Sequence, residues 1–379
     1  MDKKNKNPNV PNLRFSYKGD WSKRKLNEIC QFFKGNGLSK SDLSNEGFPC
    51  ILYGELYTTY KNEVISDIIS KTNTTLSNPF LSRNNDLIIP GSGEDPIDIA
   101  VARAICQNDI ILGGDLNILR PKSNVSAAFL SYQLSGVRRY DIAKKAQGKS
   151  IVHLHNSDLK EVLVSIPTYN EQLHIVKLLT KIDEMIETQS KIIDSYFSLS
   201  KAISNTLIGQ SKGNTRLREC LNCYSSNTME SVIKQEDLGD YPVYGANGII
   251  KKINNYEIEY PSIAIVKDGS GVGKMFKLSG KYSILSTLNY LTSKPGYDID
   301  YIYYALKQKS LKKYVVGSGI PHIYFKDYEQ EKIYIPQNEL QQQNITSVLQ
   351  SIDEEIGNEI KQLKNYELLK KYLLKNMFV

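Results

Sequence analysis

The sequence predicts an α+β protein built as an internal repeat, in which two α+β domains are each followed by a long amphipathic helix. Three observations predict this. Stretches of the first half recur in the second half, and two regions of sustained helical periodicity follow matching stretches. The regions between them carry short β-rich runs separated by Gly, Asn and Ser. The 379 residues allow two or three domains.

The repeat is clearest around the start of each predicted helix. GKSIVHL (148–154) matches GSGIPHI (317–323), with one glycine, one isoleucine and one histidine in register. EQLHIVKLLTKIDEMI (171–186) then matches QQQNITSVLQSIDEEI (341–356). Because both matches lie in the same order, the chain is one variable block and one helical block written twice.

The first domain is predicted over 13–165. Its run DLIIP (86–90) is typical of a buried strand, and AAFLSYQL (127–134) is typical of a helix. The polar segment that precedes it, 1–12, lacks the apolar stretch of a signal peptide, and we predict a disordered lead-in.

The second domain is predicted over 212–335. SIAIV (262–266) and KIYIP (332–336) are typical of strands, and YIYYAL (301–306) is typical of a helix. Its elements therefore resemble those of the first domain.

The long helices are predicted over 166–211 and 336–379, beginning soon after Pro167 and Pro336. Apolar residues recur at spacings of three and four, which favours helices of coiled-coil type with a partner-binding seam. A helix of some 40 residues is about 60 Å long, too long for one small domain to cover. Packing of each helix on its own domain is the alternative. The predicted seam residues are Ile175, Leu179, Ile182, Ile186, Ile193, Ile345, Leu349, Ile352, Ile356 and Leu363.

Basic residues cluster just ahead of the matching glycine–isoleucine–histidine segments in both halves. A basic cluster in the same place of two repeats suits contact with phosphate, whereas a solvated helix face is the alternative. The clusters comprise Arg138, Arg139, Lys144, Lys145 and Lys149 in the first half and Lys307, Lys309, Lys312 and Lys313 in the second.

The segment DGSGVGKM (268–275) resembles a phosphate-binding loop but lacks its pattern. Asp268 stands where that loop needs a glycine, and Met275 replaces the hydroxyl residue that holds magnesium. PGSG (90–93) in the first half lacks the VGK that follows here, so we interpret the glycines as a turn between strands.

Other catalytic or metal-binding patterns are weak. SNPF (77–80) lacks the second proline of an adenine-methyltransferase loop, and Cys220 and Cys223 have no second pair at metal-ligand spacing. The sequence therefore predicts no catalytic residue and no metal site.

Composition narrows the class of protein. The net charge of +7 permits a polyanionic partner without proving one. No apolar run reaches the roughly 20 residues of a membrane span. Five cysteines spread over a long chain favour a reducing cytoplasm over a disulfide framework.

This layout resembles the specificity subunits of type I restriction-modification systems. The resemblance runs from about residue 13 to the end and is carried by the two glycine–isoleucine–histidine segments, the Ile-Pro before each helix, and the helix starts at 171 and 341. The second copy differs slightly, with Gln341 in place of an acidic residue and one extra residue after Pro336.

The resemblance implies two target-recognition domains and two helices that pack antiparallel as a spacer. Each domain would read one half of a split double-stranded DNA target. Two methyltransferase subunits would dock on the chain, and restriction-translocase subunits would join them. S-adenosylmethionine, ATP and magnesium would belong to those partners, and this chain would carry no cofactor. For DNA contact we expect both basic clusters together with His153, Ser318 and His322.

Each histidine could instead be buried and structural. Two other functions are also weighed. The first is a two-domain protein-binding scaffold without sequence-specific DNA binding, and the second is a stand-alone enzyme that uses 268–275.

Overall fold

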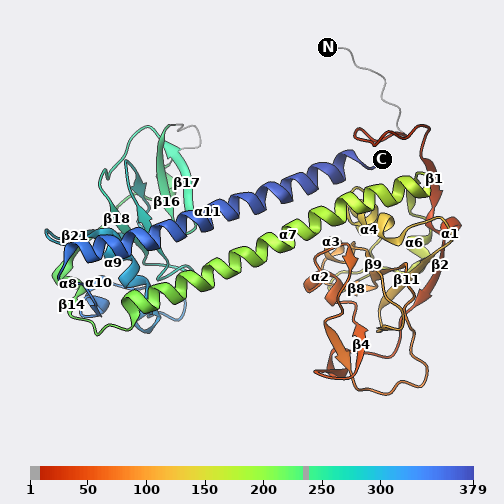
Figure 1. The fold of residues 1–379 in the computed structure, drawn as a ribbon, viewed down its shortest axis with the longest axis horizontal. Coiled ribbons are helices and arrows are strands. Elements are labelled where there is room, and N and C mark those ends of the chain that lie inside the picture. The colour runs from red at the N-terminus through yellow and green to blue at the C-terminus, as the bar shows by residue number, and fades with distance from the viewer. Residues whose placement is uncertain (1–8, 234–238) are drawn as a thin grey trace, which may run out of the picture. The chain divides into compact units, whose positions relative to one another are not determined.

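The computed structural model describes residues 9–233 and 239–379 and divides into two compact units (Figure 1). The described residues of unit 1 lie within Met1–Ser190 and Lys361–Val379, and those of unit 2 lie within Lys191–Ile360. None of the helices in the described part of the chain combines the length and the apolar content that crossing a bilayer needs.

Unit 1 is built on a five-stranded, largely antiparallel sheet in the order β2-β11-β7-β9-β5. Its central strand, β7, is the run DLIIP, which is buried along its whole length because both faces of the sheet are covered. The strands are β2 (Cys30–Lys34), β11 (Leu116–Pro121), β7 (Asp86–Pro90), β9 (Arg103–Ile105) and β5 (Val64–Ile65).

Smaller elements surround this sheet. A second sheet comprises β10 (Ile111–Leu112), β4 (Phe48–Ile51), β6 (Ser70–Thr72) and β3 (Leu43–Ser44), and two-stranded pairs join β1 (Ser22–Lys25) to β13 (Leu163–Ile166) and β12 (Val152–His153) to β8 (Ser92–Gly93). The helical segments are α1 (Leu26–Ile29), η1 (Lys40–Asp42), α2 (Glu55–Thr58), α3 (Pro96–Ile99), α4 (Ala127–Ser135), α5 (Arg139–Ala143) and α6 (Asn156–Lys160).

Unit 2 has a four-stranded sheet in the order β15-β21-β18-β19, a three-stranded sheet in the order β17-β16-β20, and the pair β14-β22. The strands are β14 (Thr215–Arg216), β15 (Leu221–Ser225), β16 (Tyr241–Gly245), β17 (Gly248–Ile253), β18 (Ser262–Val266), β19 (Met275–Leu278), β20 (Ser283–Ile284), β21 (Leu288–Ser293) and β22 (Lys332–Ile333). The helical segments are α8 (Leu217–Cys220), η3 (Glu230–Val232), α9 (Ile299–Lys307), η4 (Leu311–Tyr314) and α10 (Phe325–Tyr328).

The two units share one architecture, which confirms the predicted α+β class with an internal repeat. In order and in register, β2-β11-β7-β9 of unit 1 correspond to β15-β21-β18-β19 of unit 2. The predicted helices at 127–134 and 301–306 are α4 and α9.

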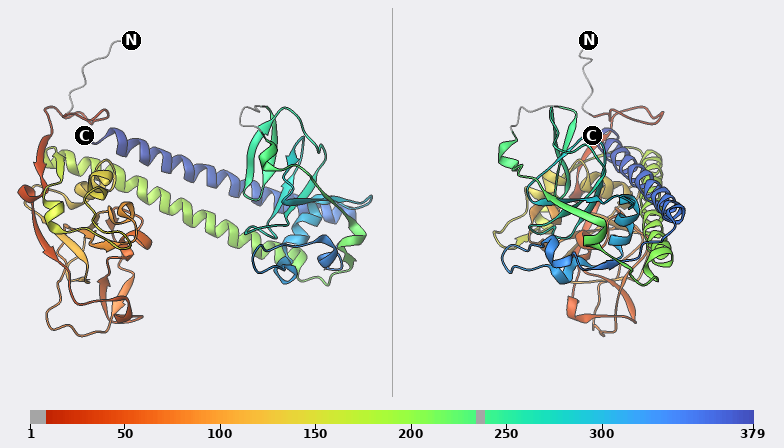
Figure 2. Two further views of the ribbon diagram at one scale, coloured as in Figure 1. Left: turned by 180° about the vertical axis from the view of Figure 1, so that it is seen from behind. Right: turned by 90° about the vertical axis from the view of Figure 1, so that its left-hand side faces the viewer.

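The long helices are α7 (Tyr169–Ser204), which continues into a π-helical turn (Asn205–Gly209), and α11 (Glu339–Asn376), drawn as continuous ribbons in Figures 1 and 2. The two helices start in the same way. The Gln172 side chain donates to the Pro167 carbonyl at 3.0 Å, and the Gln342 side chain donates to the Pro336 carbonyl at 2.8 Å. These glutamines hold the chain that leads into each helix.

Each unit is fastened to a long helix by a tyrosine–aspartate hydrogen bond. Tyr132 on α4 donates to Asp183 on α7 at 2.7 Å, and Tyr304 on α9 donates to Asp353 on α11 at 2.9 Å. Burial and the nearby aspartate raise the pKa of both tyrosines above their ordinary value, so both phenols keep the proton that they donate.

The predicted seam residues at the start of α7 face two neighbours within unit 1. Ile175, Leu179 and Ile182 are buried in one cluster with side chains of unit 1 such as Phe129 and with Leu373 of α11. The first turns of α7 thus lie beside the last turns of α11, in antiparallel directions. In unit 2 the seam residues Ile345 and Leu349 are buried in the core beside α9. Ile193 and Ile356 are also buried, whereas Ile186, Ile352 and Leu363 are half-buried.

Part of the predicted lead-in is described. Residues 1–8 lie outside the described residues, but the backbone carbonyl of Asn9 accepts a hydrogen bond from the Trp21 amide at 2.9 Å. Trp21 is itself buried against Phe129 and Phe378. The segment around residue 9 is therefore tied to the core of unit 1.

A buried ionic cluster holds the end of α11 on unit 1. Lys370 Nζ lies 2.6 Å from Asp183 Oδ1 and 2.6 Å from Glu63 Oε2, and both carboxylates are almost fully buried. Burial alone would lower the pKa of Lys370, but the two carboxylates raise it above its ordinary value. The lysine is thus charged and neutralises two buried acids.

We predict that Lys370→Ala loosens the end of α11, because it leaves two buried carboxylates facing each other without a cation. The local free energy of unfolding over 361–379, measured by amide hydrogen exchange, should fall by about 3 kcal/mol. Lys371→Ala removes an exposed neighbouring charge and is the control, with an expected change within about 0.5 kcal/mol. Equal changes for both variants would contradict this role of Lys370.

Candidate nucleic-acid interface

A tight loop in unit 1 presents the segment 148–153. The Gln147 amide donates to the His153 carbonyl at 2.9 Å, and the His153 amide donates back at 2.7 Å. Gly148, at the neck of the loop, has a φ of +131°, and a Cβ there would lie 2.0 Å from the Ile151 carbonyl oxygen. Only glycine fits this position, which explains its place in the repeated segment.

Unit 2 builds the same loop over 317–322. The Val316 amide donates to the His322 carbonyl at 2.9 Å, and the reverse bond is 2.8 Å long. Gly317 has a φ of +96°, and a Cβ there would lie 2.4 Å from the Ile320 carbonyl oxygen. The match in sequence is therefore a match in backbone geometry.

Each loop is anchored on the end of a buried strand of its own unit. The Leu154 amide donates to the Gly91 carbonyl after β7, and the Ile323 amide donates to the Lys267 carbonyl after β18, both at 2.9 Å. His153 pairs with Ser92, and His322 pairs with Asp268. Ser92 and Asp268 therefore occupy equivalent positions. The GSG motif at 91–93 and the GSG motif at 269–271 consequently do not occupy equivalent positions.

The DGSGVGKM segment is a turn between β18 and β19, as its composition predicts. The Val266 amide donates to the Lys274 carbonyl at 2.9 Å, and the Gly273 amide donates to the Val266 carbonyl at 2.8 Å. A strand follows Lys274, whereas a phosphate-binding loop is followed by a helix. The structure thus gives no support to a nucleotide site there.

In the basic cluster of unit 1, some residues bond to the protein's own backbone and others are open to solvent. Arg139 donates to the Ile97 carbonyl at 3.1 and 3.0 Å, and Arg138 donates to the Val379 carbonyl at 3.0 Å. Lys144 and Lys149 are exposed and Lys145 is half-buried, and none of the three forms an ion pair within the described residues. The positive charge open to solvent near the 148–153 loop thus comes from lysine.

The basic cluster of unit 2 divides similarly. Lys313 pairs with Glu331 at 2.6 Å, and the hydrogen bond raises the pKa of the lysine and lowers that of the glutamate. Lys307 lies over the Tyr303 ring, with Nζ 5.1 Å from the ring centroid. Lys309 and Lys312 are in no ion pair of the described residues, and Lys312 is exposed.

The predicted loop residues are accessible. His153 is exposed, His322 is half-buried, and Ser318 is exposed on the loop of unit 2. His153 is thus not buried, whereas the Nδ1 atom of half-buried His322 lies 3.3 Å from the Ile320 carbonyl oxygen of its own loop. The predicted lysines flank these loops, and in unit 2 the loop also borders the glycine turn. An exposed loop with flanking lysines is suited to a phosphate backbone.

Comparison with known families decides what these paired units are. The family model for the type I restriction modification DNA specificity domain matches residues 18–195 and again residues 215–365. The chain belongs to this family. It is a type I specificity subunit, a non-catalytic component that works in a complex with DNA. Such a subunit carries no cofactor itself. The alternative of a protein-binding scaffold is not favoured.

Curated relatives carry the same family description. The type I restriction enzyme MjaVIII specificity subunit of Methanocaldococcus jannaschii is 34% identical over 169 residues, which are 41% of this chain and 39% of that relative. This chain therefore aligns with only about two fifths of that relative. A putative type I specificity subunit of Mycoplasma genitalium, S.MgeORF438P, is 24% identical over 399 residues, covering 97% of this chain and 96% of the relative.

Solved structures support the fold. The S subunit of a type I restriction-modification system from M. genitalium superposes with a TM-score of 0.70 at 20% identity, covering 98% of this chain and 99% of that one. A chain from a structural study of complex assembly and conformational transition in a type I system gives a TM-score of 0.50 at 14% identity, with 94% and 97% covered. At these identities the similarity shows the shared fold.

Sequence reasoning missed two exposed apolar residues on the paired loops. Ile151 is 57% exposed and Ile320 is 71% exposed, at equivalent positions of the two units. An exposed isoleucine at the same place in both units is available for apolar contact with a partner. The repeat itself carried this signal, because both residues lie in the matched segments, but their exposure depends on the loop conformation.

Cysteine chemistry gives no support to a metal centre in this specificity subunit. Burial raises the pKa of Cys220 to about 12 and that of Cys223 to about 11, so both are neutral thiols and poor ligands. Within residues 9–233 and 239–379, no group of three or more metal-binding side chains comes together.

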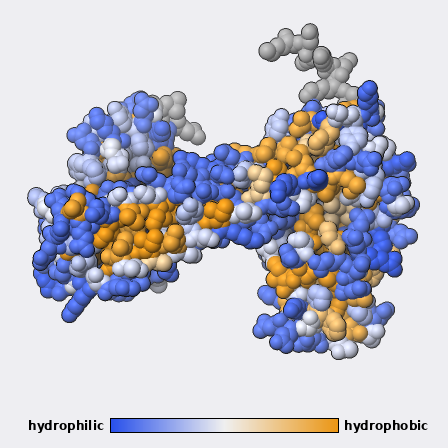
Figure 3. All heavy atoms as spheres, viewed as in Figure 1, coloured by the Kyte–Doolittle hydropathy of each residue, from blue (hydrophilic) through white to orange (hydrophobic). Residues whose placement is uncertain are grey.

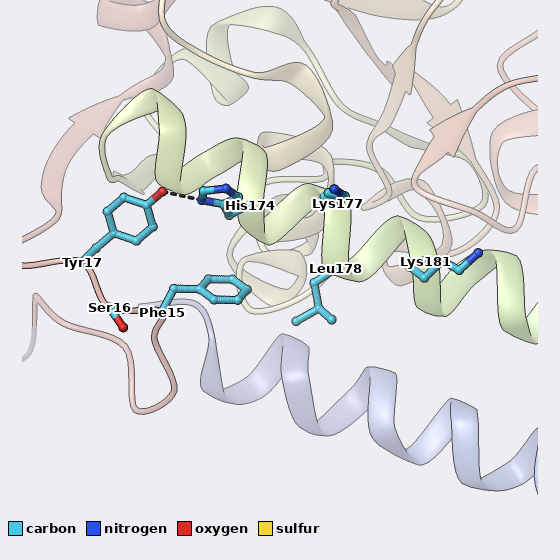
Figure 4. Close-up of a pocket in the computed structure, with 7 residues that line it drawn as sticks. All are labelled: Phe15, Ser16, Tyr17, His174, Lys177, Leu178 and Lys181. Atoms are coloured by element: carbon cyan, nitrogen blue, oxygen red, sulfur yellow. Dashed lines mark hydrogen bonds between the residues drawn. The ribbon is translucent and has the colours of Figure 1, made fainter.

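A groove lies at the start of α7 in unit 1 (Figure 4). It has a volume of about 580 Å³, and its walls are Phe15 and Tyr17 on one side and His174, Lys177 and Leu178 on the other. The Tyr17 hydroxyl is hydrogen-bonded to His174 Nδ1, which fixes the loop against the helix. The groove offers an apolar floor with basic residues at its rim.

We predict that Lys149 contacts DNA phosphate, whereas Arg139 supports the fold. In duplex binding by the assembled complex, Lys149→Ala should reduce the slope of log affinity against log salt by about 1, uniformly across sequences. Arg139→Ala should leave that slope unchanged and lower thermal stability, because its guanidinium holds the Ile97 carbonyl. An unchanged slope in Lys149→Ala would remove this lysine from the interface.

Proposed function

We propose that each unit of this specificity subunit reads one half of a split, asymmetric duplex target. The observation that carries the proposal is that one loop arrangement, 148–153 and 317–322, is built twice on equivalent strand ends. A shared backbone frame gives both units the same way of approaching a duplex. The side chains around the two frames differ, so the two halves of the target should differ in sequence.

The recognition domains would be 13–165 and 212–335, and the helices 166–211 and 336–379. Phosphate contacts from Lys144, Lys145, Lys149, Lys309 and Lys312, with His153, Ser318 and His322 on the loops, would set the register on DNA. Work on chromosomal DNA would place the subunit in the cytoplasm.

The long helices would dock two methyltransferase subunits, one for each half of the chain. Exposed apolar side chains support this, since helices that keep such residues in water generally have a partner. Figure 3 shows apolar surface over the helices of each unit. These residues are Leu173, Leu368, Leu369 and Tyr372 in unit 1 and Phe197, Leu199, Leu340 and Val348 in unit 2.

Those partners would bring the chemistry. S-adenosylmethionine would bind the methyltransferase subunits, and ATP and magnesium would act in restriction-translocase subunits that join the same complex. The groove lined by Phe15, His174 and Lys177 is one place on unit 1 that an acidic, partly apolar partner surface fits.

The test is to co-express this chain with the methyltransferase encoded beside it and to map methylated adenines across the genome. We expect one split motif, with two unlike halves and a fixed gap, that appears only when both proteins are present. Methylation at a continuous, undivided motif would contradict the proposal that the two units read separate halves.

Stoichiometry of the purified complex provides the second part of the test. Native mass measurement should give two methyltransferase subunits for each copy of this chain. A complex with one methyltransferase would contradict paired docking while leaving the split target intact.

A further inference from the structure

A hairpin in unit 2 has the chemistry of a DNA-reading element. It is formed by β16 and β17, labelled in Figure 1, and β17 is the edge strand of its sheet. Between Tyr241 and Tyr256 there is no Asp or Glu, whereas the segment holds Lys251, Lys252 and three asparagines. The segment therefore carries net positive charge, which is complementary to a polyanion.

The side chains at the end of this hairpin are those that recognise base edges. Asn247 lies in the turn and is exposed, and Ile249 beside it is 55% exposed, whereas the exposed Lys252 lies toward the open end of the hairpin, opposite Pro242. Amide and ammonium groups donate to purine acceptors in the major groove, and aliphatic groups contact the thymine methyl. A two-stranded antiparallel ribbon is also one of the shapes that the major groove admits.

The glycine turn at 267–274 holds the hairpin end in place. Lys274 Nζ donates to Asn247 Oδ1 at 3.2 Å, which orients the amide so that its NH₂ group remains as the donor. A Cβ on Gly271 would lie 3.6 Å from Ala246 Cβ, so the turn packs closely on the hairpin.

The same turn also contacts the loop already placed at the interface. The Gly269 amide donates to the Pro321 carbonyl at 2.9 Å, and Asp268 forms a bridge to His322. Hairpin, glycine turn and the 317–322 loop therefore form one continuous surface of unit 2.

In unit 1 the strand β4, which corresponds to β16, pairs antiparallel with β6 as β16 pairs with β17, but the two strands are joined by the longer connection 52–69. This connection contains α2 (Glu55–Thr58), and Glu55 accepts a hydrogen bond from the Leu52 amide at 2.7 Å. A tight turn between the two strands is thus found in unit 2, where it lies next to the glycine turn that contacts the 317–322 loop.

We propose that the β16–β17 hairpin enters the major groove of the second half-target and that Asn247, held by Lys274, donates to a base acceptor there. This inference rests on the proposed function, since it assumes that the two units read separate halves. The DGSGVGKM segment then has a role after all: it supports a base-reading side chain and binds no nucleotide.

The experiment maps adenine methylation in cells that carry the chain with its methyltransferase, as wild type, Asn247→Ala, Lys274→Ala or Lys332→Ala. Lys332 is an exposed lysine on β22 of the same unit and serves as the matched control. In both test variants we expect the preference at one position of one half-site to fall about tenfold or more, the size of a lost base contact. The other half-site, the gap and the Lys332→Ala motif should be unchanged.

An unaltered motif in Asn247→Ala would overturn the inference, as would equal relaxation of both half-sites. If a variant methylates nothing, the purified complex is tested by competition with duplexes substituted in one half-site at a time. Retained discrimination in both halves then overturns the inference, and discrimination lost in one half alone supports it. A wild type without a split motif is a failure of the proposed function and is seen before any variant is compared.

Discussion

The tyrosine–aspartate hydrogen bond between each unit and a long helix is the interaction on which the rest of the structure depends. Tyr132 and Tyr304 stand on equivalent helices, and Asp183 and Asp353 stand on equivalent turns of α7 and α11. Asp183 is buried and Asp353 is half-buried, and a carboxylate withdrawn from water is costly without such a partner, so the bond helps to fix how each sheet is oriented on its helix. Repeating the bond repeats that orientation, and with it the place at which each loop is presented.

On this shared frame the two units have diverged where contact with a target would vary. The strand order, the glycine loops and the helix starts are common to both, whereas the connection from β4 to β6 in unit 1 contains α2 and the one from β16 to β17 in unit 2 is a tight turn. In unit 1 the end of α11 is also held by the ionic cluster of Lys370 and Glu63. A shared sheet and loop arrangement with different surrounding segments suits the recognition of two different half-targets.

The sequence predicts the fold class and the repeat because both rest on local patterns. Gly148 and Gly317 match because each is forced by a positive φ, and the helices follow from apolar spacing. The roles of single basic residues could not be predicted in the same way. Arg139 and Lys149 have the same charge and nearly the same place in the sequence, but only the fold brings the Ile97 carbonyl to one of them. Likewise, Ile175 packs on α4 as well as on the end of α11. This depends on the tertiary fold, and the heptad pattern alone does not predict it.

The central claim is that two equivalent loops contact one duplex from the two units. Hydrogen exchange of the assembled complex tests it most directly, with the cognate duplex and with duplexes in which one half-site is scrambled. We expect slower exchange over 147–153 and 316–322 with the cognate duplex, and loss of protection in one loop for each scrambled half. Protection of neither loop, or loss of both loops' protection with either scrambled half, would contradict it.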